Sequence, residues 1–284
     1  MKLPAFESVY GVDFSGAKRA GLTTWVARTE PRRSRSGLVL VELERLDRLA
    51  GTVERSACLD HLVRLVAGST AALWGVDAPF GLPVELFPAG SGWGEQVRFL
   101  AEWGDDAYGC GLECIRRAKR LGDRMHLRRT TDADAKAPFD SYHYRIVYQM
   151  FHGIRDLAGP LSRTPGTAVL PFQYMKLPRA RRVVVECCPS SVLKKLGLPH
   201  HNYKQPSGGP LTWKRRSTRR AILEGLARLV RIGGRHRPVI MRNPGGDALD
   251  AVIAAVGAIR GVSAADHRAI ARHHRYPREG FLFA

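Results

Sequence analysis

Short apolar runs separated by turn residues organise the first part of the chain. Val9 to Val12, Leu22 to Ala27 and Leu38 to Leu43 each combine apolar and β-branched residues over four to six positions, which is typical of strands. The connections between these runs are short, so we predict an antiparallel meander. The segment from Thr29 to Ser36 contains a proline and three arginines and is expected to be an exposed hairpin loop.

The segment after the meander has apolar residues at the spacing of a helix. Apolar residues recur at helical spacing between Ser56, a predicted cap, and Gly68, which ends the helix. The apolar run from Ala71 to Val76 predicts a fourth strand, and Arg181 to Glu186 predicts a fifth. Residues 84–180 lie between them and show no strand alternation, so we expect a helical insertion, with one helix from Ser141 to Leu157.

Three further helices are predicted after the fifth strand. A short one runs from Ser190 to Leu196, a basic one from about Ser217 to Val230, and a strongly apolar one from Asp247 to Ile259. This order of elements predicts a single α/β domain over residues 1–284, with a five-stranded mixed sheet flanked by helices.

Composition narrows the possible partners. The chain has 284 residues and a formal net charge of +19, which favours an anionic partner such as nucleic acid, a membrane surface or a phosphorylated metabolite. No run of 18 apolar residues occurs and the N-terminus lacks a secretory apolar region, so we expect no membrane association. The five cysteines follow no secreted spacing, which favours a reducing, cytoplasmic location.

Acidic residues are scarce, and several fall at predicted strand ends. Asp13, Asp77 and Glu186 end the first, fourth and fifth strands, and Asp247 and Asp250 open the last helix on one face. Ligand sites form at strand ends in open α/β sheets. Converging carboxylates repel one another unless a hard cation lies between them. We therefore predict these five residues as catalytic, with Asp13, Asp77 and Asp250 binding Mg²⁺ or Mn²⁺, as two ions.

Structural explanations exist for some of these acids. Asp13 and Asp77 precede turns and could simply form them. Asp247 could cap its helix, with Asp250 as the acidic partner of a capping box. A purely structural role explains Asp250 and Glu186 less well, because a buried carboxylate is costly without a partner.

Basic residues cluster in the second half of the chain. Between residues 177 and 237 there are 15 lysines and arginines and only two acidic residues. Cations at a helix start oppose the helix dipole, which favours a bound phosphate there. The predicted phosphate-binding residues lie in three segments of the chain: Lys18, Arg128, Arg129, Lys214, Arg215, Arg216 and Arg219.

Five segments, in order, resemble the successive motifs of domain-of-unknown-function family 429, described as predicted nucleases of the ribonuclease-H-like superfamily. They are GVDFSGAK (11–18), GVDAPFGLP (75–83), VVECCPSSVLKKLG (184–197), GDALDAVIAA (246–255) and YPREGFLF (276–283). The resemblance implies a five-stranded mixed sheet of order 3-2-1-4-5, with strands 1 to 3 antiparallel.

The resemblance also implies roles for the acids. Asp13 becomes the first-strand metal ligand, Asp77 the fourth-strand acid, and Asp250 with Asp247 the acids of the last helix. Holliday-junction resolvases of that superfamily usually carry glutamate where this chain has Asp77, and Glu186 is not a standard ligand there.

The expected function is metal-dependent hydrolysis of DNA or RNA. Two alternatives stay open: a nucleic-acid-binding protein without catalysis, and an ATP-dependent phosphotransferase of the actin-like superfamily, which uses a related sheet and a similar Asp-Gly turn.

Overall fold

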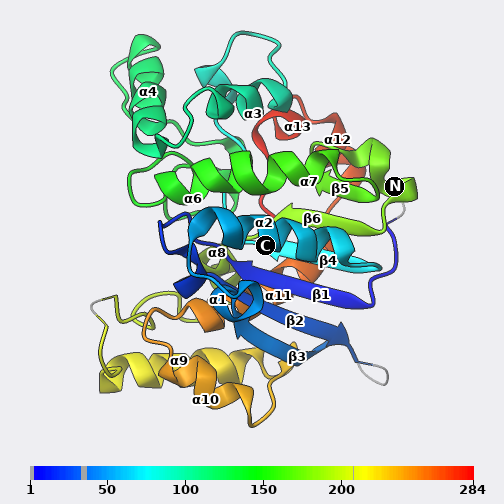
Figure 1. Ribbon diagram of the computed structural model, residues 1–284, viewed down its shortest axis with the longest axis vertical. Coiled ribbons are helices and arrows are strands. Elements are labelled where there is room, and N and C mark those ends of the chain that lie inside the picture. Colours follow the sequence, from blue (N-terminus) through cyan, green and yellow to red (C-terminus); the bar gives the residue numbers. More distant parts are fainter. Residues whose placement is uncertain (1–2, 33–36, 207) are drawn as a thin grey trace.

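A computed structural model describes residues 3–32, 37–206 and 208–284. A seven-stranded mixed sheet forms its centre, in the order β5-β6-β4-β1-β2-β3-β7 (Figure 1). The strands are β1 (Ser8–Asp13), β2 (Trp25–Pro31), β3 (Leu38–Arg45), β4 (Ala72–Val76), β5 (Thr167–Leu170), β6 (Arg182–Glu186) and β7 (Val230–Arg231). β1, β2 and β3 pair antiparallel, whereas the other neighbours pair parallel.

The predicted α/β class and mixed sheet are confirmed, but the predicted count of five strands is wrong. β5 and β7 lie at the two edges and contain only four and two residues, too few for a visible alternation. The second strand begins at Trp25 rather than Leu22, because Ala20–Leu22 forms a 3-10 turn. Residues 33–36 of the arginine-containing hairpin loop lie outside the described residues.

Helix α11 (Asp247–Ala264) packs very closely on one face of the sheet. An added Cβ at Gly11 of β1 would lie 1.9 Å from the carbonyl oxygen of Ala251, and one at Gly75 of β4 would lie 2.5 Å from Cβ of Ala258. Only glycine on the strands permits this approach. The glycines thereby fix the position of the first turn of α11 beside the ends of β1 and β4.

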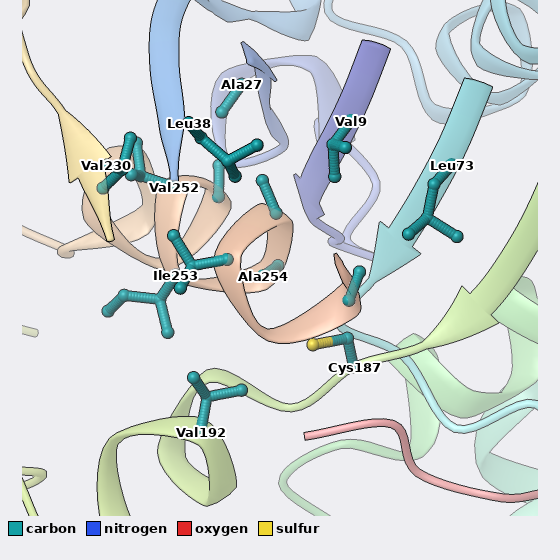
Figure 2. Close-up of a cluster of buried hydrophobic side chains, with 14 of the residues drawn as sticks. Val9, Ala27, Leu38, Leu73, Cys187, Val192, Val230, Val252, Ile253 and Ala254 are labelled. Carbon is teal, nitrogen blue, oxygen red and sulfur yellow. The ribbon is translucent and has the colours of Figure 1, made fainter. Parts of the chain in front are cut away.

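The same face carries three further helices: α8 (Pro189–Lys195), α9 (Trp213–Leu226) and α10 (His236–Arg242). α9 begins four residues before the sequence predicts, since the Thr212 side chain accepts a hydrogen bond from the Arg215 backbone N–H and caps it there. Figure 2 shows the core on this side, a single cluster that includes Val9, Leu73 and Val252.

The opposite face is covered by α1 (Leu46–Ala50) and α2 (Arg55–Gly68), which pack on a second cluster that includes Val12, Val76 and Trp74. α2 is capped by the Glu54 carboxylate, which accepts from two backbone N–H groups, and not by Ser56 as predicted.

The segment between β4 and β6 is mainly helical. Its elements are η2 (Val84–Leu86), α3 (Trp93–Ala101), α4 (Ala107–Arg120), α5 (Thr130–Asp134), α6 (Val147–His152), η3 (Gly153–Ala158), α7 (Gly159–Arg163), β5 and η4 (Tyr174–Arg179). The predicted helix over 141–157 begins only at Val147, because residues 141–146 form turns. This segment has its own small core, which includes Phe99, Cys110 and Met150.

The chain ends with α12 (His267–Arg272), α13 (Tyr276–Glu279) and a tail that returns to the sheet beside Glu186. Within the described residues, every helix is too short or too polar to cross a membrane.

Candidate functional site

A cavity of about 820 Å³ opens where the parallel strands end. β1, β4 and β6 run in the same direction and end on the left of Figure 1, between α6 above and α9 below. All five predicted acids line it. Other lining residues come from the loops around it: Ser15, Phe139, Arg145, Gln149, Cys188, His200, His201, Tyr203, Lys204 and Arg215.

The register of β1 and β4 places Asp13 and Asp77 side by side. Val12 pairs with Val76, and the Asp77 backbone N–H donates to the Val12 carbonyl oxygen at 2.8 Å. Alternate residues of a strand share a face, so both aspartates follow Gly11 and Gly75 on the face that α11 covers. Asp13 is only 8% exposed.

Asp250 enters the cavity from α11. Because Gly11 and Gly75 let this helix approach the strands, its first turn lies beside Asp13 and Asp77. Asp250 is 1% exposed, and Asp247 lies one turn earlier on the same helix.

The capping alternative for these two acids is wrong. Gly246, with φ of 90°, is the N-cap of α11, and no side chain caps the helix there. The Asn243 side chain instead accepts from the Ala248 backbone N–H at 3.1 Å. The start of α11 therefore does not require Asp247 or Asp250 as a capping residue.

Sequence reasoning missed two residues that contact Asp250. The Tyr203 hydroxyl donates to one carboxylate oxygen at 2.9 Å, and the Lys204 ammonium forms an ion pair with the other. Both residues lie in the loop before α9, and the Lys204 side chain is 44% exposed. The loop has no periodic pattern, so only the high local density of basic residues pointed toward it.

Burial and mutual repulsion dominate the electrostatics of the cavity. Burial raises the pKa of Asp77 to about 8, and the Asp250 charge adds to this while Lys204 opposes it. Burial also raises the pKa of Asp13 well above its ordinary value, with Lys204 opposing and Asp250 adding. Burial raises the pKa of Asp247 as well. The ionised carboxylates therefore need more positive charge than Lys204 supplies.

The cavity does not provide a cysteine nucleophile. Cys188 lines it, but burial and the Asp77 charge raise the pKa of the thiol to about 12. A thiol with this pKa stays protonated near neutral pH and reacts slowly.

Glu186 also lines the cavity, but its hydrogen-bond partners differ from those of the three aspartates. It pairs in register with Val76, so its side chain starts from the opposite face of the sheet. Arg129 donates to both Glu186 oxygens, at 2.8 and 2.5 Å, and the Phe80 backbone N–H donates at 3.0 Å. The carboxylate is thus held by a buried ion pair.

Arg129 is 1% exposed, and the same guanidinium also donates to Asp132 and to the Glu279 carbonyl oxygen. These bonds use all five of its N–H groups, which leaves none for a phosphate. Arg219 is fully buried and donates to four backbone carbonyls, those of Tyr203, Ile240, Asn243 and Pro244. The structure gives both arginines a structural role in place of the predicted phosphate contact.

Of the other predicted phosphate-binding residues, Arg215 lines the cavity. The remaining four are exposed and lie outside its lining: Lys18, Arg128, Lys214 and Arg216.

The chemistry of Asp13, Asp77 and Asp250 fits a hard divalent cation, which prefers carboxylate oxygens. The raised pKa values of Asp13 and Asp77 also indicate that a nearby positive charge would stabilise their ionised forms. Among the residues that the structure describes, no three acidic, histidine or cysteine side chains already stand in a metal-holding arrangement. Asp250 is instead paired with Lys204, so a metal ion at Asp250 would have to compete with that ammonium for the same carboxylate.

This competition predicts the effect of Lys204→Met. We expect the variant to bind Mn²⁺ about tenfold more tightly, because the ammonium both occupies Asp250 and repels a second cation nearby. Isothermal titration of the metal-free protein measures the affinity. Lys18→Met, at an exposed lysine outside the cavity lining, is the matched control and should leave it unchanged. An unchanged or weaker affinity in Lys204→Met would contradict the competition.

Compared with models of protein families, with curated proteins and with solved structures, the chain matches none of them. The resemblance to domain-of-unknown-function family 429 therefore stays a prediction.

Proposed function

We propose that this protein is a divalent-metal-dependent phosphodiesterase of ribonuclease-H-like type that hydrolyses nucleic acid. The observation that carries the proposal is the meeting of three carboxylates from three separate elements in one cavity: Asp13 of β1, Asp77 after β4 and Asp250 of α11. Burial and mutual repulsion raise the pKa of two of them. Clustered, electrostatically costly acids are typical of functional sites rather than of stabilising networks.

Asp13, Asp77 and Asp250 would hold Mg²⁺ or Mn²⁺, which when bound supplies charge neutralisation and an activated water. The three carboxylates would hold the cation at the ends of β1 and β4. In the hydrolysis, the water oxygen forms a bond to phosphorus, the bond to the leaving sugar oxygen breaks, and that oxygen takes up a proton.

The rim of the cavity suits a phosphate-bearing substrate. Arg145 and Arg215 line it, and the half-exposed Lys204 ammonium reaches the floor beside Asp250. Basic groups around a small acidic centre attract the phosphate backbone. This arrangement supports a phosphodiester as substrate better than a neutral one.

Metal dependence tests the proposal directly. We expect the purified protein to cleave labelled oligonucleotides with Mg²⁺ or Mn²⁺ present, and to lose the activity when EDTA removes the ion. Gel analysis of DNA and RNA oligonucleotides, in parallel, measures cleavage. Activity should return when Mn²⁺ is added in excess of EDTA.

Other outcomes would favour the alternatives. Oligonucleotide binding with no cleavage under any divalent ion would indicate a non-catalytic nucleic-acid-binding protein. ATP binding and phosphoryl transfer without cleavage would indicate the actin-like phosphotransferase. EDTA-resistant cleavage would contradict the metal site.

A further inference from the structure

One side of the acidic cavity carries aromatic rings beside a lining arginine. Tyr144 is 64% exposed and directly precedes the cavity-lining Arg145. Isolated exposed apolar residues are ordinary, but the Tyr144 ring lies beside the guanidinium of the lining residue Arg145.

The Tyr144 side of the mouth forms a small platform. The Arg145 guanidinium lies 5.6 Å from the centre of the Phe139 ring and 5.8 Å from that of Tyr144. Phe139 also stacks on His143, and the rings are 4.6 Å apart. Interleaved planar cations and rings of this kind are the surfaces on which unpaired bases stack.

The buried position of the acids limits the form of the substrate. Asp13 and Asp250 are 8% and 1% exposed, and the cavity volume of about 820 Å³ lies in the usual range for a small bound molecule. A double helix has a persistence length of about 150 base pairs and does not bend sharply enough to place a single phosphate on the floor of such a cavity. A flexible single strand can place one phosphate on the floor while its neighbouring bases stay at the mouth.

Resting on the proposed function, we infer that the substrate is single-stranded nucleic acid, with bases stacked on the Tyr144–Arg145 platform. The exposed residues Lys214 and Arg216 precede and follow the lining residue Arg215 on α9 and would supply further positive charge for the strand. The aromatic rings supply the contact that a double helix, with its bases already stacked, cannot make.

Binding to the cleavage-deficient Asp13→Asn protein tests this inference. Fluorescence anisotropy at one fixed salt concentration compares a labelled single strand, as DNA and as RNA, with the duplex of the same sequence. We expect at least about tenfold tighter binding of the single strand, and a loss of about 5- to 150-fold when Tyr144→Ala is added, since one stacked base contributes about 1–3 kcal/mol. Tyr108→Ala, at an aromatic residue of α4 that is 55% exposed, is the control and should change nothing.

Two results would overturn the inference: equal or tighter duplex binding, or an unchanged affinity in the Tyr144→Ala protein. Hydrolysis of a small chromogenic phosphodiester by the wild-type protein with Mn²⁺ separates this failure from that of the proposed function. Hydrolysis without preferential single-strand binding would refute only the substrate form. Single-strand binding without hydrolysis of any diester would refute the catalytic proposal and leave the binding surface in place.

Discussion

Asp13→Asn is expected to abolish hydrolysis while leaving the fold intact or more stable. The amide keeps the shape of the side chain but removes one of the charges that would hold the metal ion, so we expect a loss of at least about 100-fold in the cleavage rate. Burial and the neighbouring acids raise the pKa of Asp13, so its ionised form costs free energy near neutral pH. The amide avoids this cost, and the melting temperature of the metal-free protein should stay the same or rise.

The opposite directions of the two effects make the result informative. A residue that merely forms a turn would lose stability without a specific loss of metal binding. Calorimetry with Mn²⁺ and thermal melting, both on the metal-free protein, give the two readouts beside the cleavage assay. Asp60→Asn, at an exposed residue of α2, is the matched control and should alter none of them. Cleavage by Asp13→Asn at the wild-type rate would contradict the site.

The sequence located the floor of the cavity because strand ends and helix starts have local signals. Asp13 and Asp77 follow apolar runs directly, and Asp250 interrupts an apolar helix. Gly11 and Gly75 bring these acids together, because they allow α11 to pack closely on β1 and β4. The sequence shows these glycines but does not show which helix packs against them.

The rest of the site depends on contacts between distant residues. Lys204 comes from an irregular loop, and its partner Asp250 lies 46 positions further along the chain. Arg129 and Glu186 are 57 residues apart. Such pairs leave no periodic signal, and an arginine that binds a phosphate has the same sequence appearance as one buried against carboxylates. For Glu186, alternation along β6 and its pairing with β4 would have indicated the opposite face, had the register been known.

Arg129→Leu is expected to lower the free energy of unfolding by about 3–5 kcal/mol, because it leaves two buried carboxylates without their partner. Glu186 and Asp132 both accept from this guanidinium, and each is at most 3% exposed. The arginine also donates to the Glu279 carbonyl oxygen, so the substitution loosens the C-terminal tail from the strand ends. Urea unfolding followed by circular dichroism measures the loss. Arg128→Leu, at the exposed neighbouring arginine, should change the free energy by no more than about 1 kcal/mol.

A double-mutant cycle identifies the cause of the loss. If the cost of Arg129→Leu comes from the unpaired charge of Glu186, then adding Glu186→Gln should restore part of the stability, since a neutral amide is less costly to bury than a carboxylate. If the cost comes only from lost packing, the two losses should add. Coupling between the two substitutions would place Glu186 in the structural framework behind the cavity, and its mutation would then reduce cleavage through unfolding. Additive losses, together with a folded Glu186→Gln protein that binds Mn²⁺ poorly, would instead support the predicted catalytic role of Glu186 and add it to the metal-binding residues.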